Sequence, residues 1–297
     1  MTLLLALLLV QTPEPPAERL QPLDRTGRVT SWQTEWMPDA ALYPAYLADP
    51  QTPRTGTKVF TPIRAGKPAS IGKKNEITSR PVKIENSIGS SRTIWRKVDY
   101  ANEEGVDFGV DAAVISRFDI SQAWDMDSAD YMFGFPIGYR LGRFSARLRP
   151  WHLTSHIGDE IISRIGRGAI RYHKEELELG FAYDWTPEIR TYVDAGFGLY
   201  IGTPNKRWRA QCGAEWAGEV YWKGPPRTYV AIDVKWRQET DWDTAICIQS
   251  GFFLLQGADG YKPGFRIFLE TYFGHSPQTQ FPEERNLYWG VGFAAGF

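Results

Sequence analysis

The sequence predicts an all-β protein, a single antiparallel transmembrane β-barrel of about 12 strands, with about 10 strands as the alternative. Three observations support this prediction. Apolar and polar residues alternate with a period of two along most of the chain after Ser91, as in strands with one apolar and one polar face. The alternating stretches run for about 10–12 residues, the length that a tilted strand needs to cross a bilayer. The polar faces combine charges of both signs with glycine and tyrosine, which is typical of a narrow, filled lumen.

The chain before the barrel divides into two expected parts. Residues 1–20 are expected to be a signal peptide, because the apolar run from Met1 to Val10 fits the core of a secretory signal and is too short to span a bilayer. Residues 21–53 are rich in proline and polar residues, and we expect an irregular leader that packs partly in the lumen. The barrel is expected to span residues 54–297. No other stretch of sequence is long enough for a transmembrane helix, so insertion would require a barrel.

The individual strands follow from the alternation. The first two strands are expected near Thr55–Ile63 and Thr93–Asn102. The clearest later strands are Arg190–Ile201, Thr228–Arg237, Phe265–Phe273 and Leu287–Phe297. A soluble lipocalin-like barrel, the competing fold, would turn the apolar faces inward, whereas a membrane barrel turns them toward lipid. Strand length favours the membrane, as does the terminal Phe297, which resembles the last residue of bacterial outer-membrane barrels.

Connection lengths predict how the barrel is oriented. Tight turns are expected at Leu141–Arg143 and Trp185–Glu188, and longer loops at Ser121–Asp130, Ile157–Gly168 and Gly274–Arg285. Outer-membrane barrels place short turns and both termini in the periplasm and long loops outside. The predicted location is therefore the bacterial outer membrane, with outer-membrane lipid as the partner. A net charge of −1 provides no basic field for binding nucleic acid, so that partner class is excluded.

The two cysteines are expected to remain free thiols. Cys212 falls on the apolar face of its strand, Cys247 falls on the polar face of another, and a further strand intervenes. Residues on opposite faces of non-neighbouring strands cannot reach disulfide geometry.

Residues 151–160, with the sequence WHLTSHIGDE, gather the candidate site residues at the expected outer rim. Strict alternation would turn His152, Thr154 and His156 toward lipid headgroups. Proline cannot donate to the strand ladder and tolerates a β-bulge, so we favour a change of phase at Pro150 that places these side chains in the lumen.

The chemical interpretation of this stretch makes His152 a general base and Thr154 its hydroxyl nucleophile. Asp159 or Glu160 could orient His156 or hold a divalent cation with it; no other cofactor is expected. Outer-membrane lipid hydrolases carry a His-x-Ser-Asn stretch, which His-Leu-Thr-Ser resembles. The alternative, which we prefer, is that these groups bond to lumen arginines and hold the following loop.

Three segments carry a resemblance to a known family. They are ALYPAYLADPQTPR (residues 41–54), VISRFDIS with DMDSADYMFGFPIGYR (within residues 114–140), and WHLTSHIGDE followed by RYHKEELELGFAYDW. Together they resemble the bacterial family catalogued as domain of unknown function twelve-oh-seven. Its members usually have His-x-Ser-Ser-His-x-Gly-Asp-Glu, so Thr154 stands where serine is usual. The resemblance implies an exported barrel-like protein and no particular activity.

Two functions are consistent with these patterns. The first is a passive one, in which the protein is a structural barrel or a narrow pore. The alternative is a lipid or acyl-ester hydrolase at the outer rim that uses His152 with Thr154.

Overall fold

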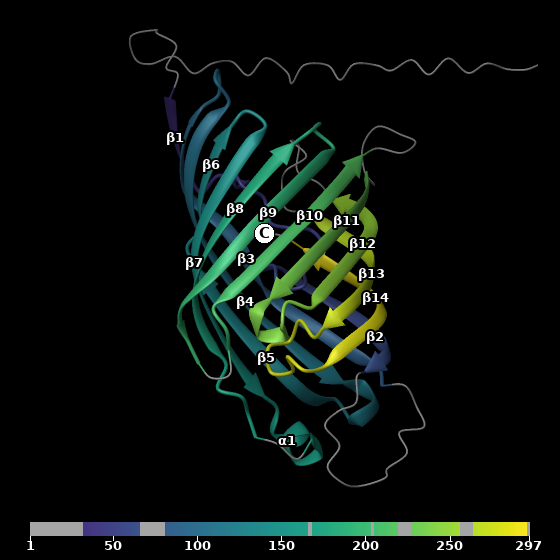
Figure 1. Ribbon diagram of the computed structural model, residues 1–297. Coiled ribbons are helices and arrows are strands. Elements are labelled where there is room, and N and C mark those ends of the chain that lie inside the picture. The colour runs from purple at the N-terminus through teal and green to yellow at the C-terminus, as the bar shows by residue number, and fades with distance from the viewer. Residues whose placement is uncertain are drawn as a thin grey trace, which may run out of the picture.

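The described residues of the computed structural model form a closed antiparallel barrel of 12 strands (Figure 1), which confirms the predicted fold class. The structure describes residues 32–65, 81–165, 168–202, 205–218, 227–255 and 264–295. The expected signal peptide and Phe297 lie outside these residues. No helix in the described ranges has the length and apolar character needed to cross a membrane.

The elements follow one another around the barrel. They are β1 (Trp32–Trp36), β2 (Thr55–Ala65), β3 (Lys83–Asp99), β4 (Glu104–Asp119), β5 (Asp125–Gly134), β6 (Ile137–Leu141), β7 (Phe144–Ile157), α1 (Asp159–Ile165), β8 (His173–Asp184), β9 (Ile189–Ile201), β10 (Trp208–Gly218), β11 (Arg227–Arg237), β12 (Thr244–Leu255), β13 (Phe265–His275) and β14 (Arg285–Ala295). Two short 3₁₀ turns, Ile120–Gln122 and Gln238–Thr240, lie in the β4–β5 and β11–β12 connections.

Two features explain why the strands numbered β1 to β14 make a closed wall of only 12 strands. β5 and β6 both pair with β4 and β7, so they form one wall position that is interrupted at Phe135 and Pro136. β1 pairs only with the end of β3 and stands outside the closed wall. The wall closes where β2 pairs with both β14 and β3. β1 lies within the segment expected to be irregular, and the sequence did not predict it.

The connections largely follow the predicted alternation of short and long. The tight turns after β6 and β8 are confirmed at residues 142–143 and 185–188, and the long connections after β7 and β13 lie at residues 158–172 and 276–284. The expected loop Ser121–Asp130 is wrong, because β5 already begins at Asp125. The expected strand Thr93–Asn102 covers only the second half of β3 and runs past its end at Asp99.

The wall turns apolar side chains outward and charged side chains inward. On β11, Ile232 is 37% exposed on the outside, whereas the neighbouring Asp233 is 2% exposed on the inside. Cys212 lies partly exposed on the outer face and Cys247 is buried on the inner face, and both are free, as predicted. An apolar exterior around a charged interior is the arrangement of an outer-membrane barrel and the reverse of a soluble one.

Candidate functional site

The interior of the barrel is occupied by the chain itself. Residues 37–54, which we call the plug segment, leave β1 at Met37, whose φ of 50° turns the chain, and pass through the lumen before β2 begins. Tyr43, Tyr46, Ala48 and Asp49 of this segment are each 5% exposed or less. The plug segment is therefore a core element of the barrel, even though it has no regular secondary structure.

Two tyrosines fix the first part of the plug segment. The Tyr46 ring stacks on Tyr192 of β9 with centroids 3.7 Å apart, and its hydroxyl donates to Asp194 at 3.0 Å. The guanidinium groups of Arg147 and Arg190 lie 4.7 and 4.8 Å from the centre of the Tyr43 ring, within cation–π range. Burial raises the pKa of Tyr46 well above its usual value, so its hydroxyl remains a donor.

Asp49 fixes the second part of the plug segment through charge. Its carboxylate accepts from Lys235 Nζ at 2.8 Å and from Gln211 Nε2 at 3.1 Å. Burial alone would raise the pKa of Asp49, but the Lys235 ammonium and the hydrogen bonds from Lys235, Gln51 and Gln211 lower it to about 2. Asp49 is thus ionised at neutral pH and forms a buried ion pair with the wall.

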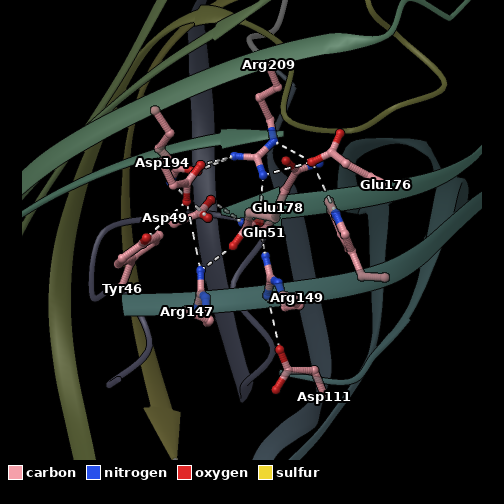
Figure 2. A network of polar contacts seen from close by, with 12 residues as sticks. Tyr46, Asp49, Gln51, Asp111, Arg147, Arg149, Glu176, Glu178, Asp194 and Arg209 are labelled. Atoms are coloured by element: carbon pink, nitrogen blue, oxygen red, sulfur yellow. Dashed lines mark hydrogen bonds and ion pairs between the residues drawn. The ribbon is translucent and has the colours of Figure 1, made fainter. Parts of the chain in front are cut away.

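Next to the plug segment, the wall carries a lattice of charges that we call the arginine–carboxylate network (Figure 2). Its members are Asp111, Arg147, Arg149, Glu176, Glu178, Asp194 and Arg209. Arg209 contacts three carboxylates, those of Glu176 at 2.8 Å, Glu178 at 2.6 Å and Asp194 at 2.8 Å. Glu178 in turn binds Arg147 and Arg149. Charges buried this deeply are tolerated only when they are paired.

At the other end of the lumen, the β13–β14 connection folds inward. Residues 276–280 of this connection include four polar side chains that are 2% exposed or less, Ser276, Gln278, Thr279 and Gln280. Thr279 Oγ1 donates to Asp130 at 2.9 Å, and the Ser155 hydroxyl donates to the same carboxylate at 2.5 Å. Ser155 belongs to the WHLTSHIGDE stretch, so the inward side of that stretch holds this loop in place.

Two small cavities lie between these groups. One cavity of about 20 Å³ lies where Gln51 of the plug segment meets Pro277 of the inserted loop and Cys247 of the wall. A second, of about 10 Å³, lies beside Tyr43 and Arg147. Each has room for about one water molecule. The plug segment, the network and the inserted loop thus all place buried side chains in the described lumen.

The sequence-predicted site residues lie elsewhere, on the outer face of β7. β7 alternates without a break, and its pairing with β8 is continuous from Phe144 to Thr154, so His152, Thr154 and His156 point outward. The predicted change of phase at Pro150 is wrong, and so is the predicted position of these three side chains in the lumen. The irregularity sits in the neighbouring wall position instead, at Phe135 and Pro136, and the Pro150 carbonyl accepts a hydrogen bond from Phe135 across that break.

On this outer face the predicted residues are only partly brought together. His152 Nδ1 lies 2.6 Å from Glu175 Oε1 of β8, and the two side chains are 41% and 44% exposed. The Thr154 hydroxyl donates to the Tyr172 carbonyl at 3.3 Å rather than to His152. The His156 ring packs edge-on against Tyr131 at 5.5 Å. The sequence pattern did not predict a role for Glu175, because its contact with His152 depends on the β7–β8 register.

The acidic pair of the motif lies at the outer rim. Asp159 and Glu160 form the exposed first turn of α1. Across the described ranges, no group of three or more His, Cys, Asp or Glu side chains has an arrangement that could hold a metal ion. A cation held by Asp159 or Glu160 with His156 stays a prediction.

Comparison with solved structures finds other barrels. The chain is similar to the Salmonella typhi outer membrane phospholipase (OMPLA) dimer with bound calcium, with 11% identity over 84% of this chain and 93% of that one and a TM-score of 0.49. It is also similar to the KdgM porin, with 8% identity over 82% and 99% and a TM-score of 0.41, and to the NanC porin, with 8% identity over 82% and 100% and a TM-score of 0.42. No curated protein sequence matches the chain significantly.

The sequence itself supplies the assignment. The family model described as "Protein of unknown function (DUF1207)" matches residues 11–297, nearly the whole chain, and confirms the resemblance carried by the three segments. The chain therefore belongs to the DUF1207 family.

Proposed function

We propose that this protein is a structural β-barrel of the bacterial outer membrane that is closed in its resting form by its own plug segment. The observation that carries the proposal is the buried ion pair between Asp49 of the plug segment and Lys235 of the wall, at 2.8 Å. A porin lumen is filled with water. Here two oppositely charged groups meet inside the lumen with a hydrogen bond from Gln211 beside them.

Other contacts of the plug segment support the same role. The Leu47 amide donates to Glu215 at 2.7 Å and its carbonyl accepts from Arg266 at 3.0 Å, so both backbone groups of one plug residue bond to wall side chains. Each such bond would have to be replaced by water if the segment left. The plug segment therefore has the contacts of a permanent element, and a pore would open only on its displacement.

Channel recordings test this proposal. Wild-type protein in planar bilayers is expected to give no steady conductance, because the plug segment lies in the lumen and its Asp49 is paired with Lys235 of the wall. Replacing both Tyr43 and Tyr46 by alanine removes the rings held by Arg147 and Arg190, and we expect discrete conductance steps from this variant. Trp36→Ala, outside the closed wall, is the matched control and should stay silent. Steady conductance of the wild type would favour the narrow-pore alternative.

A second candidate function rests on one observation, the 2.6 Å contact of His152 with Glu175 on the lipid-facing side. A carboxylate that orients a histidine beside a hydroxyl is the arrangement of a base and its nucleophile. For a lipid hydrolase, His152→Ala and Thr154→Ala should each abolish the same esterase activity, with losses that do not add. The Thr154 hydroxyl is directed to a backbone carbonyl, so we expect wild-type protein to show no turnover of phospholipid, with or without calcium.

A further inference from the structure

The outer face of the barrel carries a cluster of basic side chains at its outer end, on β8, on the connection that precedes it and on the connection from β9 to β10. We call Arg171, His173, Lys206 and Arg207 the rim patch; Arg171, Lys206 and Arg207 are exposed, and His173 is partly exposed. The Gly202 amide donates to the His173 carbonyl at 2.9 Å, so the two segments are neighbours. None of these side chains takes part in closing the lumen.

The rim patch begins where the apolar face of the wall ends. Along the outward side of β8, Leu179 and Leu177 are 45% and 37% exposed, and they are followed toward the outer end by Glu175, His173 and Arg171. On the neighbouring strands, the rings of Phe197 and Trp208 pack 4.7 Å apart directly below Arg207. In a membrane barrel, this level is the boundary between hydrocarbon and headgroups, where aromatic rings gather.

Arg207 is held in place at this boundary. Its Nη1 donates to the carbonyls of Gly198 and Leu199 at 2.6 and 3.0 Å, and its guanidinium lies 5.6 Å from the centre of the Phe197 ring. These contacts direct the charge over the apolar surface without neutralising it, since no carboxylate takes part in them. A fixed guanidinium above an apolar face suits a ligand with an anionic head and an apolar tail.

The nearby groups reinforce this preference. The His173 ring packs against Tyr200 at 5.1 Å, which presents an aromatic hydroxyl at the same level. Glu175, a carboxylate of the same face, contacts His152 of β7. Arg171 and Arg207 are both exposed at the outer rim.

We propose that the rim patch is a docking surface for the phosphate headgroup of an anionic outer-leaflet lipid, whose acyl chains lie along Leu177, Leu179 and Phe197. The lipid's phosphate would sit against Arg207 and Arg171, with His173 and Tyr200 as further donors. This assignment rests on the proposed outer-membrane position of the barrel. It is independent of whether the lumen conducts.

Lipid titration of the intact, detergent-solubilised protein tests the assignment, with native mass spectrometry as the readout. The probes are phosphatidylglycerol and phosphatidylcholine with the same acyl chains. We expect preferential binding of phosphatidylglycerol to the wild type. A basic residue near an anionic lipid surface contributes about 1 kcal/mol, so Arg207→Gln and Arg171→Gln should each weaken that binding about fivefold. Slower migration after boiling on a denaturing gel verifies that each variant is folded.

The control is Arg285→Gln, which removes an exposed arginine at the same end of the barrel, on β14, where the arginine pairs with Asp243 at 3.0 Å. This variant should bind phosphatidylglycerol like the wild type. Equal binding of the two lipids, an equal loss in Arg285→Gln, or displacement of the lipid by inorganic phosphate would each overturn the assignment. If the protein shows no preference for phosphatidylglycerol and also gives no conductance, the lipid assignment fails and the proposed function stands. If the protein conducts but binds phosphatidylglycerol as expected, only the closed lumen is contradicted.

Discussion

Replacing Arg209 by methionine is expected to lower the free energy of unfolding by about 3–5 kcal/mol, the cost of breaking a buried ion pair by removing one partner. Arg209 lies within 2.8 Å of carboxylate oxygens of Glu176, Glu178 and Asp194, and all three are 6% exposed or less. Without the guanidinium, Glu176 keeps Lys174 and Glu178 keeps Arg147 and Arg149, but Asp194 loses its 2.8 Å ion pair while it stays buried. Urea unfolding of the detergent-folded protein measures the loss.

The matched control for this prediction is an arginine at the outer rim. Arg171→Met removes an exposed arginine from the connection before β8, and surface changes of this kind stay within about 0.5 kcal/mol. Comparable losses at positions 171 and 209 would mean that the arginine–carboxylate network contributes nothing specific, and that its charges are solvated in a wider lumen.

Replacing Ile232 by arginine is expected to cost about 2–4 kcal/mol, the penalty for a cation on the lipid face near the bilayer midplane. Ile232 lies in the middle of β11 on the outward face. Asp233→Asn on the inward face should cost far less, because an asparagine oxygen can still accept from Tyr192 and Gln211, both at 2.6 Å. Ile232→Leu controls for a change of shape alone.

The same unfolding assay, carried out in lipid vesicles, compares the three variants. Equal costs at positions 232 and 233, or a larger cost at 233, would mean that the apolar face is not the lipid face and that the sheet is inside out.

The faces of the strands could be predicted from the sequence because side-chain direction in a strand has a period of two wherever no bulge intervenes. This is why Ile232 and Asp233, and Cys212 and Cys247, were assigned to the correct sides. The prediction failed at Pro150. A proline shows that the ladder is interrupted, but it does not show whether its own strand or the neighbouring one absorbs the irregularity.

The candidate sites depend on information that periodicity does not carry. Glu175 meets His152 only through the β7–β8 register, which is a long-range property of the folded wall. The plug segment has no period at all, because its residues are placed by individual contacts such as Tyr46 on Tyr192 and Asp49 on Lys235. A leader that packs in the lumen could be expected from the sequence, but its partners could not.

Closure of the lumen by the plug segment is tested most directly by the reactivity of Cys247. This thiol is 1% exposed on the inner wall and lines the small cavity between Gln51 of the plug segment and Pro277 of the inserted loop. In a Cys212→Ala background it is the sole thiol of the chain. We predict that a charged, membrane-impermeant methanethiosulfonate leaves Cys247 unmodified in the folded barrel, and that the Tyr43→Ala/Tyr46→Ala variant reacts readily. Rapid modification of Cys247 in the folded barrel with an intact plug segment would contradict the closed lumen.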